Sequence, residues 1–173
     1  KATSYCMTRN YREAYKIFAS SGILFNHESA LRQHSFVIKK IIRTALDIQE
    51  GLADTLVLGN IDVRRDFGYA PAYVEAMWRM MQQEVPDDFI ICSGFSSSIR
   101  EIVEMVFSLL QMPLSCLHTE QSLYRPAEIE ENYGNPEKAK RVLGWSYNFT
   151  LQPLIEQLIT DEKEVREFLK LHS

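Results

Sequence analysis

The sequence predicts an α/β protein with a mainly parallel sheet. Short apolar runs alternate with longer amphipathic stretches of helical period, and glycines or polar loops separate them. Because parallel strands need a crossover, usually a helix, this alternation is typical of parallel sheets. The chain has 173 residues, of which 46% are hydrophobic and 24% charged, which is ordinary for a globular protein and favours one domain.

The first predicted elements are a helix, a strand, a second helix and a second strand. Aromatic and small apolar residues recur at helical spacing across 2–20, and Gly22 is a typical stop for that helix. The apolar run 22–25 predicts a short strand that is buried on both faces. The amphipathic stretch 35–49 predicts the second helix, and the run 55–59 predicts the second strand.

Helical period and capping signals place the next elements. Residues 70–83 predict a helix, and 88–94 predict a strand. The helix predicted at 96–112 begins with Ser98 and Glu101 at the spacing of a capping box. We expect three methionines of the helix at 70–83 to pack in the core: Met77, Met80 and Met81.

The last third of the chain predicts one short strand and two helices. Residues 113–117 predict the strand. Asn135 is the expected N-cap of a helix at 135–145, and Thr150 opens the final helix. We expect the charged stretch 161–170 of that helix to face solvent.

Composition excludes several classes of function. The net charge is −4, from 19 basic and 23 acidic residues, so nucleic-acid binding is not expected and any anion site must be local. Cys6, Cys92 and Cys116 are isolated and lack metal-ligand spacing, which favours buried thiols in a reducing compartment and no metal. Without a signal peptide or a membrane-length apolar run, the expected location is the cytoplasm.

Three polar loops follow predicted strands or lie near them. Ligands of parallel α/β sheets bind in the crevice at the carboxyl ends of the strands, and arginine forks suit phosphate groups. Lys40, one helical turn beyond Phe36, can point back at the same crevice. The polar candidates of the three loops are Asn26, His27, Glu28 and Arg32; Asn60, Asp62, Arg64, Arg65 and Asp66; and Tyr124, Arg125 and Glu128.

The residue types of these loops also allow purely structural roles. Asn26 and His27 can satisfy backbone groups at a strand end, and residues 62–66 can form a solvated surface network. Arg125 and Glu128 can form a local ion pair. No GxGxxG occurs among the seven isolated glycines, so the usual phosphate-binding turn is absent from the chain.

Taken in order, the loops resemble a specific family. Similarity to GDP-mannose 4,6-dehydratases, members of the extended short-chain dehydrogenase/reductases, extends over "NYREAYKIFASSGILFNHES", "LGNIDVRRDFGYAPAYVEAMWRMMQQEVPDDFIICSG" and "YRPAEIEENYGNPEKAKRVLGW". The NHES and RRDFG loops separate this subfamily from most other nucleotide-sugar enzymes. The resemblance covers essentially the whole chain but only the second half of such an enzyme.

The resemblance implies a catalytic lysine and a reaction. The family carries a Tyr-x-x-x-Lys pair, and Lys1 matches its lysine, while the matching tyrosine falls four residues upstream of this sequence. In the family this lysine contacts the nicotinamide ribose and lowers the pKa of the tyrosine. The implied activity is a lyase reaction, the NADP-dependent conversion of GDP-mannose to GDP-4-keto-6-deoxymannose on the route to GDP-fucose.

The resemblance also implies roles for the loop residues. Lys1, His27 and Arg32 match cofactor contacts of the family. The positions that match the GDP-sugar site, with Arg65 and Arg125 at the diphosphate and Glu128 at the nucleotide, are Asn26, Val37, Lys40, Arg65, Arg125 and Glu128.

The same comparison implies a division of the chain. Residues 1–60 are expected to form the end of the NADP-binding Rossmann-like domain with an interleaved substrate-binding segment. Residues 61–173 are expected to form mostly the smaller GDP-sugar-binding domain, with 66–93 returning to the Rossmann-like sheet. A homo-oligomer, dimer or tetramer, is implied, although "ESALRQH" replaces the "ESPRRGE" that helps to form the family's tetramer contact.

Two alternatives to this enzyme remain open from the sequence. One is a related nucleotide-sugar dehydratase or reductase, against which the NHES loop argues. The other is a non-catalytic chain that acts as a binding or interaction module, with a sheet edge that favours association. We expect the 173-residue chain alone to show no turnover.

Overall fold

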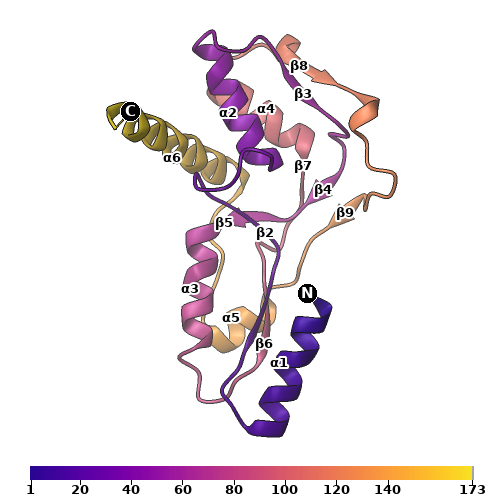
Figure 1. The fold of residues 1–173 in the computed structure, drawn as a ribbon, viewed down its shortest axis with the longest axis vertical. Coiled ribbons are helices and arrows are strands. Elements are labelled where there is room, and N and C mark those ends of the chain that lie inside the picture. The colour runs from indigo at the N-terminus through magenta and orange to yellow at the C-terminus, as the bar shows by residue number, and fades with distance from the viewer. Residues whose placement is uncertain (173) are drawn as a thin grey trace. The chain divides into compact units, whose positions relative to one another are not determined.

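The computed structural model describes residues 1–172, and its contacts divide them into two compact units (Figure 1). The length of the chain favours one domain, whereas the structure interleaves three segments in each unit. Unit 1 comprises residues 1–27, 66–95 and 133–148. Unit 2 comprises residues 28–65 and 96–132 and the chain from Phe149 onward.

Unit 1 is built on a pair of parallel strands. β1 (Ser21–Leu24) pairs with β6 (Asp88–Ile91), in a register that runs from Ser21 opposite Asp88 to Leu24 opposite Ile91. Figure 1 shows α3 (Ala70–Met80) and α5 (Glu137–Leu143) on one side of β6 and α1 (Ala2–Tyr15) on the other. Parallel pairing with helices on both sides confirms the α/β class.

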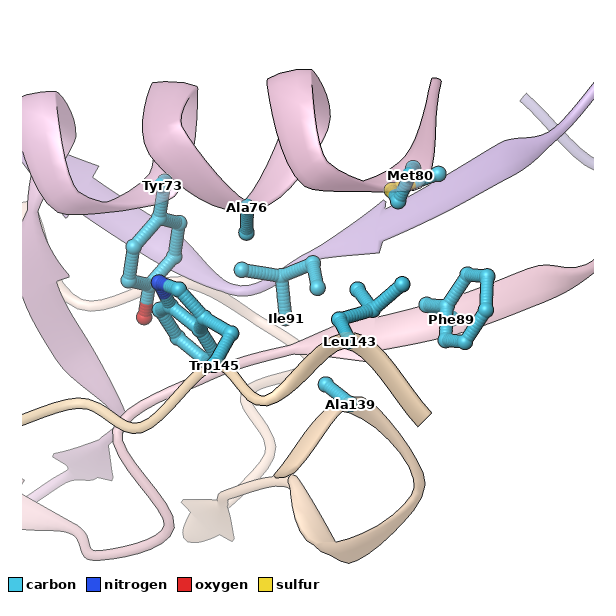
Figure 2. Packing of buried hydrophobic residues seen from close by; sticks show 8 residues of the cluster. All are labelled: Tyr73, Ala76, Met80, Phe89, Ile91, Ala139, Leu143 and Trp145. Atoms are coloured by element: carbon cyan, nitrogen blue, oxygen red, sulfur yellow. The ribbon is translucent and has the colours of Figure 1, made fainter. Parts of the chain in front are cut away.

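The core of unit 1 lies between α3, β6 and α5, as Figure 2 shows. The indole of Trp145 is buried and donates from Nε1 to the carbonyl of Ala72 over 3.0 Å. The ring of Tyr73 lies edge-on to that of Trp145, with 6.0 Å between centroids. The buried cluster consists of Tyr73, Ala76, Met80, Phe89, Ile91, Ala139, Leu143 and Trp145.

A second pair of short strands replaces part of two predicted loops. β2 (Asn26–Glu28) pairs with β5 (Phe67–Tyr69), so the polar stretch after β1 begins as a strand. Gly68 of β5 lies against Tyr73, because a Cβ added there would be 2.4 Å from a carbon of the Tyr73 ring. Only glycine fits this close approach.

Helix α1 is shorter than predicted and has no buried residue. It ends because Lys16 adopts a left-handed backbone, with φ at 56°, and the chain then runs extended to β1. Arg12 binds Asp88 of β6 through two N–H···O bonds of 2.8 Å each. This bidentate pairing with a guanidinium stabilises the ionised carboxylate and lowers the pKa of Asp88 to about 2.

Breaking this fork is expected to loosen α1. Because the pKa of Asp88 is lowered from 3.8, the ion pair contributes to stability above that value, and this contribution is lost as the pH falls toward about 2. We expect Arg12→Gln to speed tryptic cleavage at Lys16 about tenfold at neutral pH, as the loss of a charge-assisted pair predicts. Arg9→Gln, which removes only an exposed pair with Glu13, is the control and is expected to cleave like the wild type. Equal cleavage of the two variants would refute the anchoring role of Arg12.

Unit 2 is built from three helices and two sheets. α2 (Val37–Gln49), α4 (Ile99–Leu109) and α6 (Leu151–Leu171) pack on one another through their apolar stripes. β3 (Leu56–Leu58) pairs in parallel with β8 (Leu117–Thr119). These contacts bury the amphipathic faces that the sequence predicts for the three helices.

The other sheet of unit 2 is mixed and has three short strands. β4 (Arg64–Arg65) lies in its centre, antiparallel to β7 (Ser97–Ser98) and parallel to β9 (Glu131–Asn132). The predicted capping box of α4 is confirmed, since Ser98 Oγ accepts from the backbone of Glu101 and Glu101 accepts from that of Ser98. This sheet therefore joins two of the three predicted polar loops.

Several predictions of local structure are wrong. Residues 114–116 form a 3₁₀ turn, and the strand begins only at Leu117. Gly22 and Ile23 of β1 are exposed rather than buried on both faces. Met80 is buried as expected, but the other two methionines of α3 are exposed because they lie on its outer face: Met77 and Met81.

Two further predictions fail in part. Cys92 is buried, and burial raises the pKa of its thiol to about 12, but Cys6 is exposed on α1. Glu162, in the stretch expected to face solvent, is 2% exposed. No helix within residues 1–172 is long and apolar enough to cross a membrane.

Candidate functional site

A groove of about 550 Å³ lies in unit 1 between α1 and β1. Lys1 and His27, both predicted as cofactor contacts, line this groove together. Ser21 of β1 also lines it. The size of the groove is that of small-molecule sites.

His27 and Asn26 are oriented by backbone groups of unit 1. His27 Nδ1 donates to the carbonyl of Phe25 over 2.8 Å, so Nε2 is the acceptor nitrogen of the neutral ring. The ring lies 5.4 Å from that of Tyr73. The amide of Asn26 donates to the carbonyl of Asp66 over 3.0 Å, which is the strand-end role that its residue type allows. Asn26 is absent from the groove lining.

Arg65 and Glu128 form the second group, in unit 2. Arg65 Nη2 lies 3.6 Å from Glu128 Oε1, and each side chain is 19% exposed. Arg65 also donates to the carbonyl of Arg64 over 2.7 Å. A guanidinium that is held by one carboxylate and two backbone carbonyls, those of Arg64 and Glu130, and still reaches solvent, is preorganised to bind an anion.

Arg64, the neighbour of Arg65, points to the other face of β4 and is used differently. It donates to the carbonyl of Ser96 over 2.8 Å and lies 3.2 Å from Glu101 and 3.4 Å from Glu131. Successive side chains of a strand face opposite ways, so these two arginines serve different contacts. Arg64 is a structural crosslink of the three-stranded sheet.

The other residues predicted to contact the sugar do not take part in the Arg65–Glu128 ion pair. Arg125 lies exposed before β9 and makes no ion pair among the described residues, so the alternative of an Arg125–Glu128 pair is wrong. The ammonium of Lys40 donates to the carbonyl of Val57 over 2.7 Å and so ties α2 to β3. Val37 is half-buried in the first turn of α2.

Arg32 lies in the segment between β2 and α2. Its Nε is 3.2 Å from Glu28 Oε2, and its guanidinium carbon is 3.8 Å from the centre of the Phe36 ring. Glu28 is 3% exposed, and burial raises the pKa of its carboxyl to about 7, while Arg32 opposes that rise. Charge pairing and stacking on an aromatic ring therefore both orient Arg32.

Sequence reasoning missed the roles of three buried charges. The sequence allowed Asp66 to belong to a solvated surface network, but Asp66 is 0% exposed. Lys39 and Glu162 form a buried ion pair between α2 and α6. The sequence held a signal for this pair, because each residue lies on the apolar stripe of its helix. Lys39 is three residues before Ile42, and Glu162 is four residues after Leu158.

Comparison with known sequences gives a consistent family. The family model described as GDP-mannose 4,6 dehydratase matches residues 1–158. GDP-mannose 4,6 dehydratase 2 of Caenorhabditis elegans is 38% identical in an alignment 184 positions long, gaps included, which covers 96% of this chain and 48% of that protein. GDP-mannose 4,6 dehydratase 2 of Arabidopsis thaliana is 40% identical over 166 residues, 95% of this chain and 44% of that protein. The chain thus spans about half the length of these curated relatives.

Solved structures share the fold, although their sequences are more distant. RMD from Pseudomonas aeruginosa, complexed with NADPH, matches with a TM-score of 0.84 at 24% identity, over 95% of this chain and 54% of that one. A dTDP-glucose 4,6-dehydratase from Bacillus anthracis, in complex with NAD, matches with a TM-score of 0.84 at 17% identity, over 96% of this chain and 51% of that one. These matches confirm the predicted α/β fold, which the chain shares with about half of each of these two proteins. The family model matches residues 1–158 of the 173, and the two relatives are 38% and 40% identical to the chain; the chain therefore belongs to the GDP-mannose 4,6-dehydratase family.

Proposed function

We propose that this chain is the GDP-sugar-binding part of a GDP-mannose 4,6-dehydratase, with the diphosphate site at Arg65 and Glu128. The observation that carries the proposal is their pairing in unit 2, where Arg65 is held at 3.6 Å from Glu128 and keeps an exposed edge. A fork of this kind binds a diphosphate, and the carboxylate suits the N–H edge of a guanine. Arg125, exposed on the same segment as Glu128, is proposed as the second diphosphate ligand.

We assign the rest of the proposed site by unit. Unit 1 contributes the edge of the cofactor site through Lys1 and His27, which share the groove. Arg32 is proposed as a further contact of the cofactor, and Asn26, Val37 and Lys40 are proposed as contacts of the GDP-sugar. These roles, and the two-domain division into a cofactor part and a substrate part, follow from the family membership.

The reaction we propose for the parent enzyme is an internal oxidation and reduction with loss of water. NADP, when bound, supplies the acceptor and later the donor of one hydride, which leaves C4 of the mannose and returns to C6 as water departs across C5 and C6. In that reaction the ammonium of Lys1 is proposed to donate to the nicotinamide ribose and to favour the ionised form of a tyrosine base. His27 is proposed to accept a hydrogen bond from the cofactor through Nε2, because its Nδ1 donates to the carbonyl of Phe25.

We propose NADP rather than NAD, a cytoplasmic homo-oligomer and a place on the route to GDP-fucose. The family resemblance supports each of these. The row of exposed aromatic and apolar side chains on α1, which includes Tyr5, Met7 and Tyr11, supports association. Light scattering coupled to size exclusion measures the oligomer, and a monomer at micromolar concentration would contradict this part of the proposal.

Removal of Arg65 tests the diphosphate site. We expect Arg65→Ala to weaken GDP binding to the chain about tenfold to hundredfold, the worth of a bidentate charge-assisted contact. Arg125→Ala is expected to weaken it by a smaller factor in the same direction, because its side chain is not preorganised. Calorimetric titration with GDP and GDP-mannose measures both effects.

Arg64→Ala is the matched control for this titration. It removes the adjacent arginine on the opposite face of β4, so GDP affinity is expected to stay within about twofold of the wild type. Equal affinities of wild type and Arg65→Ala would reject the diphosphate site. Formation of 4-keto sugar by the 173-residue chain alone would contradict the expectation that this chain shows no turnover by itself.

A further inference from the structure

The segment of residues 29–36, between β2 and α2, has no helix or strand of its own. Its internal backbone bonds are two turns, from Arg32 N–H to the carbonyl of Ser29 and from Phe36 N–H to that of Gln33, each 3.1 Å long. Two such turns do not hold eight residues in one conformation. The conformation of this segment, which presents Arg32, therefore depends on contacts with side chains outside it.

Lys39 supplies the contact that reaches the backbone of this segment. From the first turns of α2 its ammonium donates to the carbonyl of Ala30 and to the carboxylate of Glu162 on α6. Lys39 is 5% exposed and Glu162 is 2% exposed. An ammonium has three donors and no acceptor, so in this buried place its direction is set by the two oxygens that it binds.

Glu162 is in turn held in place by Arg166, one turn further along α6. Arg166 Nε lies 3.4 Å from Glu162 Oε1, and Arg166 Nη2 donates to the carbonyl of Arg43 and to Asp47, each over 2.8 Å. Both carboxylate oxygens of Glu162 are thus engaged by cations. The chain of contacts runs from α2 through Arg166 and Glu162 to Lys39, and ends on the carbonyl of Ala30.

The surroundings of the Lys39–Glu162 pair exclude bulk solvent. Glu28, Lys39 and Glu162 line one cavity of about 10 Å³, with apolar walls that include Ile42 and Leu158. This space holds at most one water molecule. In such a place, hydrogen bonds are stronger and more directional than at the surface.

A buried ion pair is a poor source of net stability, because desolvation offsets the attraction between its charges. What this pair does provide is a fixed donor for a carbonyl of an otherwise irregular segment. We propose that Lys39 and Glu162 are positioning residues that hold residues 29–36, and with them Arg32, in the conformation that contacts the cofactor. The proposal deepens the proposed function, because it takes the cofactor as the ligand of Arg32.

Hydrogen exchange of the unliganded chain tests the positioning without any ligand. The informative variant is Lys39→Met with Glu162→Leu, which removes both charges and leaves neither stranded. We expect amides of residues 29–36 to exchange about tenfold faster, the factor that one charge-assisted hydrogen bond is worth. Amides of α4 are expected to stay within about twofold of the wild type. The single variant Lys39→Arg keeps donors for both oxygens, so its amides of residues 29–36 are expected to exchange as slowly as those of the wild type.

Lys138→Met is the matched control. Lys138 likewise binds one carbonyl, that of Asp88, and one carboxylate, that of Asp87, but it does so in unit 1. Its loss is expected to leave exchange of residues 29–36 unchanged. Unchanged exchange of residues 29–36 in the double variant would overturn the proposal, and so would equal loss of protection in 29–36 and α4, which would make the pair a support of the whole unit.

Cofactor titration separates the failure of this proposal from that of the proposed function. If residues 29–36 are released as expected, NADPH affinity is expected to fall about tenfold in the double variant while GDP affinity is unchanged. A wild-type chain that does not bind NADPH would count against the cofactor role of Arg32 and would leave the exchange result standing. NADPH binding that is equal in wild type and double variant, with residues 29–36 released, would overturn the link between the pair and the cofactor.

Discussion

Asp66→Ala is expected to unfold unit 1 under conditions in which the wild type is folded. The carboxylate is fully buried and accepts three backbone N–H groups, from Ser93 over 2.9 Å, Gly94 over 3.0 Å and Gly134 over 3.3 Å. It also accepts from the hydroxyl of Ser93 over 2.7 Å. One side chain thus ties the turn after β6 and the start of the α5 segment to β5.

The expected cost follows from the donors that the substitution leaves without an acceptor. Each unpaired backbone donor costs about 1–3 kcal/mol when it cannot reach water, so three of them correspond to a loss of at least about 3 kcal/mol. The backbone at Gly134 is closely packed, since a Cβ there would lie 2.7 Å from Cys92 Sγ. Asp66→Asn, which keeps one acceptor oxygen, is expected to lose less.

Tryptophan fluorescence in urea measures this effect on unit 1 alone. Both tryptophans of the chain, Trp78 and Trp145, lie in unit 1. Asp62→Ala is the matched control, because Asp62 is 69% exposed in its pair with Arg100 and such pairs contribute about 0–1 kcal/mol. A urea midpoint for Asp66→Ala equal to that of Asp62→Ala would refute the role of the buried carboxylate.

Glu28→Gln is expected to remove a dependence of stability on pH. The folded chain raises the pKa of Glu28 from 4.5 to about 7 through burial, so it binds this proton more tightly than the unfolded chain does. Protonated Glu28 therefore stabilises the fold most at pH values below 4.5, and this contribution declines as the pH rises and is lost above about 7. The full difference corresponds to about 3 kcal/mol.

The measurement is the free energy of unfolding of both chains at about pH 5 and about pH 8. We expect Glu28→Gln to gain stability relative to the wild type as the pH rises, because the neutral amide never carries the buried charge. Far-UV circular dichroism follows the transition, since Glu28 lies in unit 2 and the tryptophans do not. A difference between the two chains that is the same at both pH values would contradict the raised pKa.

Glu101→Gln serves as a control of opposite sign. The backbone N–H of Ser98 and the guanidinium of Arg64 lower the pKa of Glu101, so its contribution is present at neutral pH and is lost as the pH falls through that lowered value. The two substitutions are therefore expected to change the pH profile in opposite directions. A general effect of removing one carboxylate would instead move both profiles alike.

Local signals in the sequence predicted the elements well where a short stretch decides the outcome. Ser98 and Glu101 form the predicted capping box, because such a cap depends on backbone groups within one turn. Thr150 occupies the N-cap position of the final helix, as predicted, without a capping hydrogen bond from its side chain. The end of α1 was placed too late, since the left-handed turn at Lys16 has no glycine or proline to announce it. Gly22 is instead the second residue of β1.

The candidate site could be predicted only as a set of residue types near strand ends. Arg65 and Glu128 are far apart in sequence, and only the parallel pairing of β4 with β9 brings their segments together. Arg125 is nearer to Glu128 along the chain, yet it points into solvent, because the segment before β9 lacks regular structure. Choice of partner depends on strand register, which residue types do not reveal.

The sequence by itself determined the α/β class, the order of the helices and of four of the strands (β1, β3, β6 and β8), and the family of this protein, because periodicity, caps and contiguous motifs are local properties. Only the tertiary structure decided which charges are buried. Asp66 and Arg64 come from one polar loop, but the first is enclosed by three backbone donors and the second lies at the surface of a sheet. Lys39 and Glu162, 123 residues apart, meet because α2 packs on α6, and desolvation in that contact makes two ordinary surface residue types into a buried pair.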